Sequence, residues 1–96
     1  MPTFAVTYAY RANSENDRAT HRPAHLAFLE GLHHAGLLYM SGPLAGDEPR
    51  ALLVFEDTDE STLAARLDDD PFAEAGLIEA RTIATWNVFF DPRTAA

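Results

Sequence analysis

Residues 22–42, RPAHLAFLEGLHHAGLLYMSG, predict an amphipathic helix that is followed directly by a strand. Pro23 lies in the expected first turn, where a missing backbone N–H costs nothing, and Gly36 is typical of a helix C-terminus. The helix is therefore expected to begin near residue 22 and to stop at Gly36. The apolar residues 37–40 then predict a strand that ends at the turn formers of residues 41–43.

The same reasoning from periodicity and turn formers assigns the rest of the chain. In chain order we expect a strand over residues 3–10, a polar loop with at most one helical turn over 11–20, a strand over 51–56, a helix over 60–67, a short turn or helix over 70–76, a strand over 79–90 and a loose tail over 91–96. The order is βαββαβ, that of a ferredoxin-like α+β domain with an antiparallel sheet and both helices on one face. A chain of 96 residues is expected to form a single domain, residues 1–96.

The chain is acidic, with fifteen Asp and Glu residues against seven Arg and no Lys, which gives a formal net charge of −8. Nucleic acids and anionic membranes attract basic surfaces, so this balance argues against both as partners. There is no cysteine, which excludes disulfides and thiolate metal sites. The N-terminal residues lack the pattern of a signal peptide and no apolar run is long enough to span a bilayer, so the expected location is the cytoplasm.

The expected sheet carries apolar residues on both of its faces. Along residues 51–56, alternation puts Leu53 and Phe55 on one face and Leu52 and Val54 on the other. Two helices can cover only one face of four strands, and monomers rarely expose a large apolar patch. We therefore expect a homodimer that pairs through its sheet faces, as in a dimeric α/β barrel, and the sequence leaves higher oligomers open. The alternative is a monomer with a moderately apolar open face.

His25 is the most informative residue of the expected helix. At about 100° per residue it shares a core-facing stripe with Leu29, Leu32 and Gly36. A buried histidine needs a partner for each ring nitrogen. His25 is then either a core histidine bonded to a backbone carbonyl or an acid/base residue, since histidine titrates near neutral pH.

Asp70 is the last of three consecutive carboxylates and precedes Pro71. Its simplest role is the N-cap of a short helix that has Pro71 in its first position. Asp68 and Asp69 would then form a solvated helix end, although acidic residues are unfavourable there. A functional Asp70 would instead orient a histidine and stabilise its charged form.

Ser41, Gly42 and Pro43 follow an expected strand. A plain turn is the simpler interpretation, and the alternative is a pocket rim in which Ser41 and nearby N–H groups bind a substrate oxygen. His33 and His34 are neighbours on the helix and point about 100° apart, which is poor geometry for a metal pair. No nucleotide-binding or nucleophile-elbow motif is present. We therefore expect neither a metal ion nor another cofactor.

Five short motifs carry a family resemblance: residues 22–29, 36–38, 41–44, 70–72 and 75–77. In this order and spacing the chain resembles the YCII-related (YciI-like) family over nearly its whole length. The resemblance implies a dimeric α/β-barrel fold and an active site in which His25 and Asp70 form a catalytic pair. It also implies a cleft lined by Ser41, Gly42 and Pro43. Arg22 and Tyr8 are further candidates for binding a small-molecule substrate.

The resemblance also suggests a reaction class, because one related member is a dehydrochlorinase of a chlorinated hydroxyquinol, and similar folds include lactone isomerases and small monooxygenases. We expect an enzyme in which His25, oriented by Asp70, transfers a proton during isomerisation, elimination or hydrolysis of a small cyclic or aromatic compound. The alternatives are a non-catalytic module that binds a small ligand, or a structural dimer in which His25 belongs to the core. Residues 45–50 form a shorter tract than in many relatives, so the identity of the substrate is not carried over.

Overall fold

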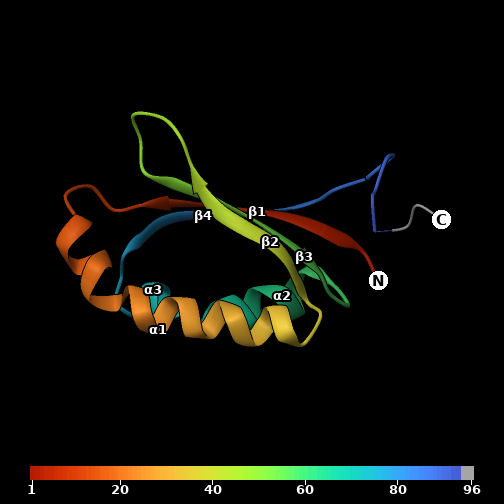
Figure 1. The fold of residues 1–96 in the computed structure, drawn as a ribbon, viewed down its shortest axis with the longest axis horizontal. Helices are drawn as coiled ribbons and strands as arrows, with labels where there is room; N and C mark the ends of the chain where they lie inside the picture. The colour runs from red at the N-terminus through yellow and green to blue at the C-terminus, as the bar shows by residue number, and fades with distance from the viewer. Residues whose placement is uncertain (94–96) are drawn as a thin grey trace.

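The computed structural model describes residues 1–93, which form four strands and three helices. In chain order these are β1 (Thr3–Tyr10), α1 (Glu15–His34), β2 (Leu38–Leu44), β3 (Arg50–Glu56), α2 (Glu60–Leu67), α3 (Pro71–Glu74) and β4 (Ile78–Thr85). The strands form one antiparallel sheet in the order β2-β3-β1-β4, and the helices lie on one side of it (Figure 1). The ferredoxin-like α+β fold predicted from the sequence is confirmed.

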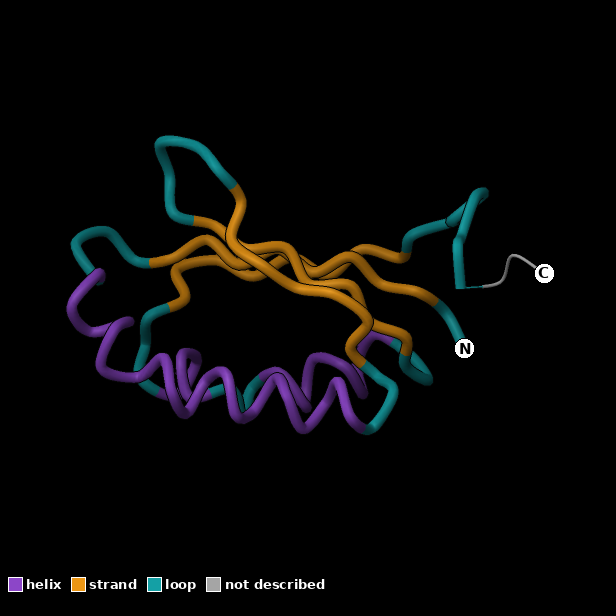
Figure 2. Tube along the Cα trace, viewed as in Figure 1, coloured by secondary structure: helices purple, strands orange, loops and turns teal. Residues whose placement is uncertain are grey.

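The core lies between the sheet and the helices, which form the two layers seen in Figure 2. The sheet face that meets the helices, here called the inner face, carries alternate residues of each strand. The buried residues of this layer are Phe4, Val6, Tyr8, Leu29, Leu38, Ala51, Leu53, Phe55, Leu63 and Leu67. Full burial of a large apolar side chain contributes about 1.5–3 kcal/mol. This layer therefore holds α1 firmly against the inner face.

Helix α1 begins at Glu15, well before the start predicted near residue 22, and Pro23 lies inside it. The loop predicted over residues 11–20 is therefore wrong for most of its length. Ser14 takes the N-cap position, and the acidic Glu15 and Asp17 suit the positive end of the helix dipole. This first half of α1 is mostly exposed and has no apolar stripe, so periodicity could not reveal it. None of the helices in residues 1–93 is long and apolar enough to cross a membrane.

Strand β2 runs on to Leu44, so the prediction that it ends at a turn of residues 41–43 is wrong. The register pairs Ser41 with Leu53 and Pro43 with Ala51 of β3. Proline lacks an N–H and is tolerated in a sheet at an edge strand, and β2 is an edge of this sheet. The turn formers therefore lie within a strand that also borders the helix layer.

Strand β4 ends at Thr85 and does not reach Phe90, the end predicted from the sequence. Its only neighbour in the sheet is β1, and Thr85 pairs with Phe4. One more backbone bond joins Trp86 N–H to the Thr3 carbonyl at 2.8 Å. The antiparallel partner β1 begins at Thr3, so the apolar residues that follow Trp86 have no strand among residues 1–93 to pair with.

The segment after β4 returns towards β2, because the Arg93 guanidinium lies 3.7 Å from the centre of the Tyr39 ring. Phe89 and Phe90 are 92% and 93% exposed. Of the tail predicted over residues 91–96, the last three residues lie outside the described part of the chain.

The face turned away from the helices, here called the outer face, is partly apolar. Leu52 and Val54 of β3 point to this side, because they alternate with the buried Leu53. Met40 of β2 pairs with Val54 and is 61% exposed. The sequence analysis is therefore right that the helices cover one face and leave large apolar side chains on the other.

Candidate active site

His25 and Asp70, which lie 45 positions apart in the sequence, are in direct contact. His25 is a buried residue of α1, and Asp70, at the start of α3, is fully buried. The distance from His25 Nδ1 to Asp70 Oδ1 is 2.8 Å. Packing of α1 against α3 thus brings together the two residues that the family resemblance predicts to form a catalytic pair.

Asp70 accepts two further hydrogen bonds. Its Oδ1 also accepts from the backbone N–H of Phe72 at 2.9 Å, which makes Asp70 the N-cap of α3, with Pro71 in the first turn. Its Oδ2 accepts from the Tyr8 hydroxyl at 3.0 Å. The carboxylate therefore accepts hydrogen bonds from three donors. The capping role and the histidine contact are compatible, and Asp70 has both.

The imidazole of His25 is also held by an aromatic stack. Its ring lies parallel to the Phe72 ring, with 3.9 Å between the centroids and an interplanar angle of 5°. The Asp70 carboxylate bonds the edge of the imidazole directly. It also caps the helix that carries Phe72, and so positions the ring that packs on the face of the imidazole. The ring has little freedom to turn.

A cavity of about 420 Å³ lies between α1 and the inner face, beside His25. Sites for small molecules typically measure about 300–1,000 Å³. Six of the residues that the sequence nominated line it: Tyr8, Arg22, His25, Ser41, Gly42 and Pro43. Asp70 lies behind His25, outside the lining. The cavity therefore gathers the predicted residues of α1, β1 and β2 around one small volume.

The second ring nitrogen of His25, Nε2, is accessible from this cavity. Nε2 has no hydrogen bond to any of residues 1–93, and within that range no buried side-chain nitrogen or oxygen lacks a partner. Nε2 must therefore reach the surface, and the surface beside His25 is the cavity wall. Because the N–H at Nδ1 donates a hydrogen bond to Asp70, Nε2 of the neutral ring carries no proton and is a hydrogen-bond acceptor.

Tyr8 contributes to the cavity wall with its ring, while its hydroxyl is already engaged by Asp70. Burial, and after it the adjacent Asp70 carboxylate, raises the pKa of the Tyr8 hydroxyl above its ordinary value of 10.0. The hydroxyl therefore stays protonated and remains a donor to Asp70. Its position suits support of the His25–Asp70 contact better than direct contact with a ligand oxygen.

Half of the residues that line the cavity were not predicted from the sequence: Tyr10, Arg18, Leu26, Leu29, Ala51 and Leu53. Arg18 was missed because its segment was predicted as a loop. A usable signal was present, since Arg18, Arg22 and His25 have the i, i+4, i+7 spacing of one helix face. Ser14 followed by acidic residues is also a recognisable helix start.

Among residues 1–93, no group of three or more His, Asp or Glu side chains is placed to hold a metal ion. His33 Nδ1 donates to the Leu38 carbonyl at 2.7 Å, and exposed His34 lies 3.5 Å from Glu30. These two histidines therefore have separate local partners, and the polar chemistry of the cavity centres on His25 and the two arginines of α1.

The model of the YCII-related domain family matches residues 3–87. A similar solved structure is 5-chloro-2-hydroxyhydroquinone dehydrochlorinase from Burkholderia phenoliruptrix, in complex with 2,5-dihydroxybenzoquinone. It is 27% identical with a TM-score of 0.79, and the match covers 88% of this chain and 93% of that chain. No curated protein matches the chain.

Two more distant structures share the fold alone. An uncharacterised NIPSNAP domain protein from Burkholderia xenovorans is 17% identical with a TM-score of 0.57, and the match covers 96% of this chain and 99% of that chain. An antibiotic biosynthesis monooxygenase is 10% identical with a TM-score of 0.58, covering 93% and 99%. With the family model matched from the first strand to the end of the last, the chain belongs to the YCII-related domain family.

Proposed function

We propose that this protein is a small-molecule enzyme in which His25 acts as general acid and base, oriented by Asp70, on a small cyclic or aromatic compound. A lyase reaction of the dehydrochlorinase type is the form we favour, before isomerisation or hydrolysis. One observation carries the proposal: Nδ1 of His25 is bonded to a buried carboxylate while Nε2 is open to a cavity. The 27% identical dehydrochlorinase supports the reaction type.

In the proposed elimination, Nε2 of the neutral imidazole takes a proton from the substrate. The electron pair left by that proton forms a new double bond, the C–Cl bond breaks and chloride leaves. The resulting imidazolium lies 2.8 Å from Asp70, which stabilises its charge. No electron is gained or lost overall, so the proposed reaction needs no redox cofactor.

The proposal is tested with 5-chloro-2-hydroxyhydroquinone and a panel of halogenated and hydroxylated rings. We expect chloride release, followed with an ion-selective electrode, at a rate above that of buffer alone and proportional to protein concentration. The product analogue 2,5-dihydroxybenzoquinone is expected to inhibit. If ring compounds bind across the panel and none is turned over, the protein is a ligand-binding module and the enzymatic proposal fails.

We also propose that two copies pair through their outer faces, with small ligands bound in the cavity of each copy. The support is the apolar outer face, where Met40 is well exposed and Leu52 half-buried, together with the absence of any helix on that side among residues 1–93. A monomer of 10.6 kDa has little core of its own, and burial of this face would add to it.

Leu52→Glu is expected to shift the protein from dimer to monomer, because the β3 position lies between β2 and β1 and the new carboxylate would be buried between two sheets. Sedimentation equilibrium would give the mass, with an increase in the dimer dissociation constant of about 10²-fold or more. Ala65→Glu adds the same charge to an exposed position of α2 and is the matched control. A wild-type protein that is monomeric at high concentration contradicts the proposal.

A further inference from the structure

Arg18 is an almost fully buried cation that lines the cavity. Its side chain is 11% exposed. The guanidinium carbon lies 4.8 Å from the centre of the Tyr10 ring, which faces the same cavity. Charged side chains are seldom buried without a counter-charge. The burial of the Arg18 charge beside the cavity therefore requires a physical explanation.

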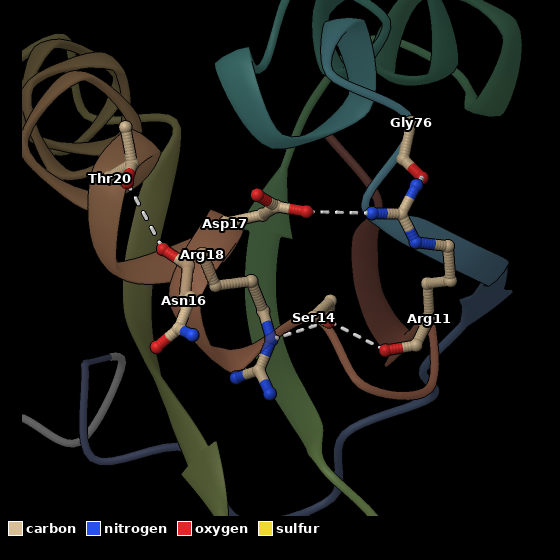
Figure 3. Close-up of polar contacts among 7 residues, drawn as sticks. All are labelled: Arg11, Ser14, Asn16, Asp17, Arg18, Thr20 and Gly76. Atoms are coloured by element: carbon tan, nitrogen blue, oxygen red, sulfur yellow. Dashed lines mark hydrogen bonds and ion pairs between the residues drawn. The ribbon is translucent and has the colours of Figure 1, made fainter.

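A network of hydrogen bonds at the start of α1 orients the Arg18 side chain (Figure 3). Arg18 Nε donates to Ser14 Oγ at 2.9 Å, and Ser14 Oγ in turn donates to the Arg11 carbonyl at 2.6 Å. The Arg11 side chain donates to Asp17 at 3.0 Å and to the Gly76 carbonyl at 3.3 Å. Ser14 is fully buried. The guanidinium is thus oriented before any ligand arrives.

The terminal nitrogens of Arg18 remain available to a ligand. Its ion pair with the exposed Glu15 is a long one, because Glu15 Oε1 lies 3.9 Å from Nη2 and so beyond hydrogen-bond distance. The only hydrogen bond from the Arg18 side chain to another of residues 1–93 is the one from Nε to Ser14 Oγ. Because no buried nitrogen in that range lacks a partner, the two Nη atoms reach accessible surface. An arginine held through Nε offers its two Nη groups as a fork.

The charges around the cavity have the opposite sign to the protein as a whole. The chain has fifteen acidic residues and seven arginines. The cavity lining contains Arg18 and Arg22 but none of the Asp or Glu residues among residues 1–93. Burial, and after it the Asp70 carboxylate behind His25, raises the pKa of the cavity residue Tyr10, and the positive charges of Arg18 and Arg22 oppose that rise. The cavity is therefore a local cationic site on an acidic protein.

We propose that the ligand of this cavity is a small ring compound that carries an ionised acidic oxygen group, a carboxylate or an acidic enol, and that Arg18 binds this group. The Nη atoms of Arg18 donate to the anion, and Arg22 adds a second positive charge from the exposed side of α1. The apolar walls formed by Leu29 and Leu53 receive the ring. Placement of the ring against His25 rests on the proposed function, whereas the selection of an anion rests on Arg18 and, to a smaller extent, on Arg22.

The test measures equilibrium binding of two ligands of nearly equal shape, 4-hydroxybenzoate and its neutral counterpart 4-hydroxybenzamide, by titration calorimetry at pH 7.5. The wild type is expected to bind the benzoate about ten- to hundredfold more tightly. Arg18→Gln is expected to reduce this preference to about threefold or less, the part that Arg22 supplies, and Arg22→Gln, at an exposed position, to reduce it about threefold. Arg50→Gln removes the same charge from an exposed position outside the cavity and is expected to keep the full preference.

Thermal unfolding of each variant would show whether it is folded. If Arg18→Gln does not fold, Arg18→Lys, which keeps the positive charge, is the second variant to test. The lysine variant should retain part of the preference, because it preserves the charge but not the fork. Equal binding of the two ligands by the wild type, binding of neither, or a preference that Arg18→Gln keeps in full would overturn the proposal. These results would leave the His25 chemistry open, since turnover is measured separately and His25→Gln should keep the anion preference.

Discussion

His25→Gln is expected to lower kcat/KM by about 10²–10⁴-fold on any substrate that the wild type converts, which is the usual contribution of a positioned acid/base residue. Glutamine can still donate a side-chain hydrogen bond to Asp70 at the position where Nδ1 does so at 2.8 Å. It cannot accept and release a proton near neutral pH as Nε2 can. The loss should therefore appear in kcat more than in KM, as steady-state kinetics would show.

His34→Gln is the matched control, because His34 lies on the same helix with its side chain 73% exposed. Both variants should bind 2,5-dihydroxybenzoquinone with wild-type affinity within about threefold, since neither change removes a charged contact from the cavity. If His25→Gln retains full turnover, the acid/base role is wrong and His25 is a core histidine. If binding and turnover fall together by the same factor, His25 contacts the ligand without transferring a proton.

The fold could be predicted from the sequence where one face of an element is buried. Phe4, Val6 and Tyr8 alternate along β1, and the spacing of His25 and Leu29 on α1 follows the helical repeat. Burial imposes these periods, so they are visible without a structure. The two layers and the βαββαβ order follow from them.

The first half of α1 could not be predicted by the same reasoning. Its residues are mostly exposed, and Arg18 is held by a hydrogen bond to Ser14 and by its contact with the Tyr10 ring. The predicted extension of β4 to Phe90 failed for the opposite reason. The apolar residues are present, but β1 begins only at Thr3, so its antiparallel pairing with β4 stops there, and a strand needs a partner as well as a pattern.

Some residues of the candidate site could be predicted from the sequence, but its geometry could not. Helical spacing placed His25 on the buried side of α1, and Asp70 before Pro71 is a local N-cap signal. Neither pattern says that the two meet. Their contact depends on how α1 packs against α3, and the Tyr8 bond to Asp70 joins residues 62 positions apart. Contacts of that kind arise only from the assembled fold.

Asp70→Asn is expected to reduce kcat/KM by about 10²-fold while leaving most of the hydrogen bonds intact. The Phe72 N–H requires an acceptor, so the amide oxygen should take the place of Oδ1 and still accept from Phe72 and from His25 Nδ1. The amide NH₂ would then donate to the Tyr8 hydroxyl, which can also accept. The tautomer of His25 is preserved, and only the negative charge beside the imidazolium is lost. At an effective dielectric constant near 20, two unit charges about 4 Å apart interact with about 4 kcal/mol, of which a part is felt in the transition state.

Asp70→Ala separates this charge effect from the structural role of the same carboxylate. Alanine leaves three donors without an acceptor, the Tyr8 hydroxyl, the Phe72 N–H and His25 Nδ1, and removes the N-cap of α3. Each buried donor left unpaired costs about 1–3 kcal/mol, so urea unfolding should show a loss of at least about 3 kcal/mol, against a much smaller change for Asp70→Asn. Asp69→Asn removes the same charge from an exposed neighbouring position and should change neither stability nor turnover. Full activity in Asp70→Asn would mean that the buried carboxylate serves only to cap α3 and hold the imidazole in place, because the charge would then contribute nothing to the reaction.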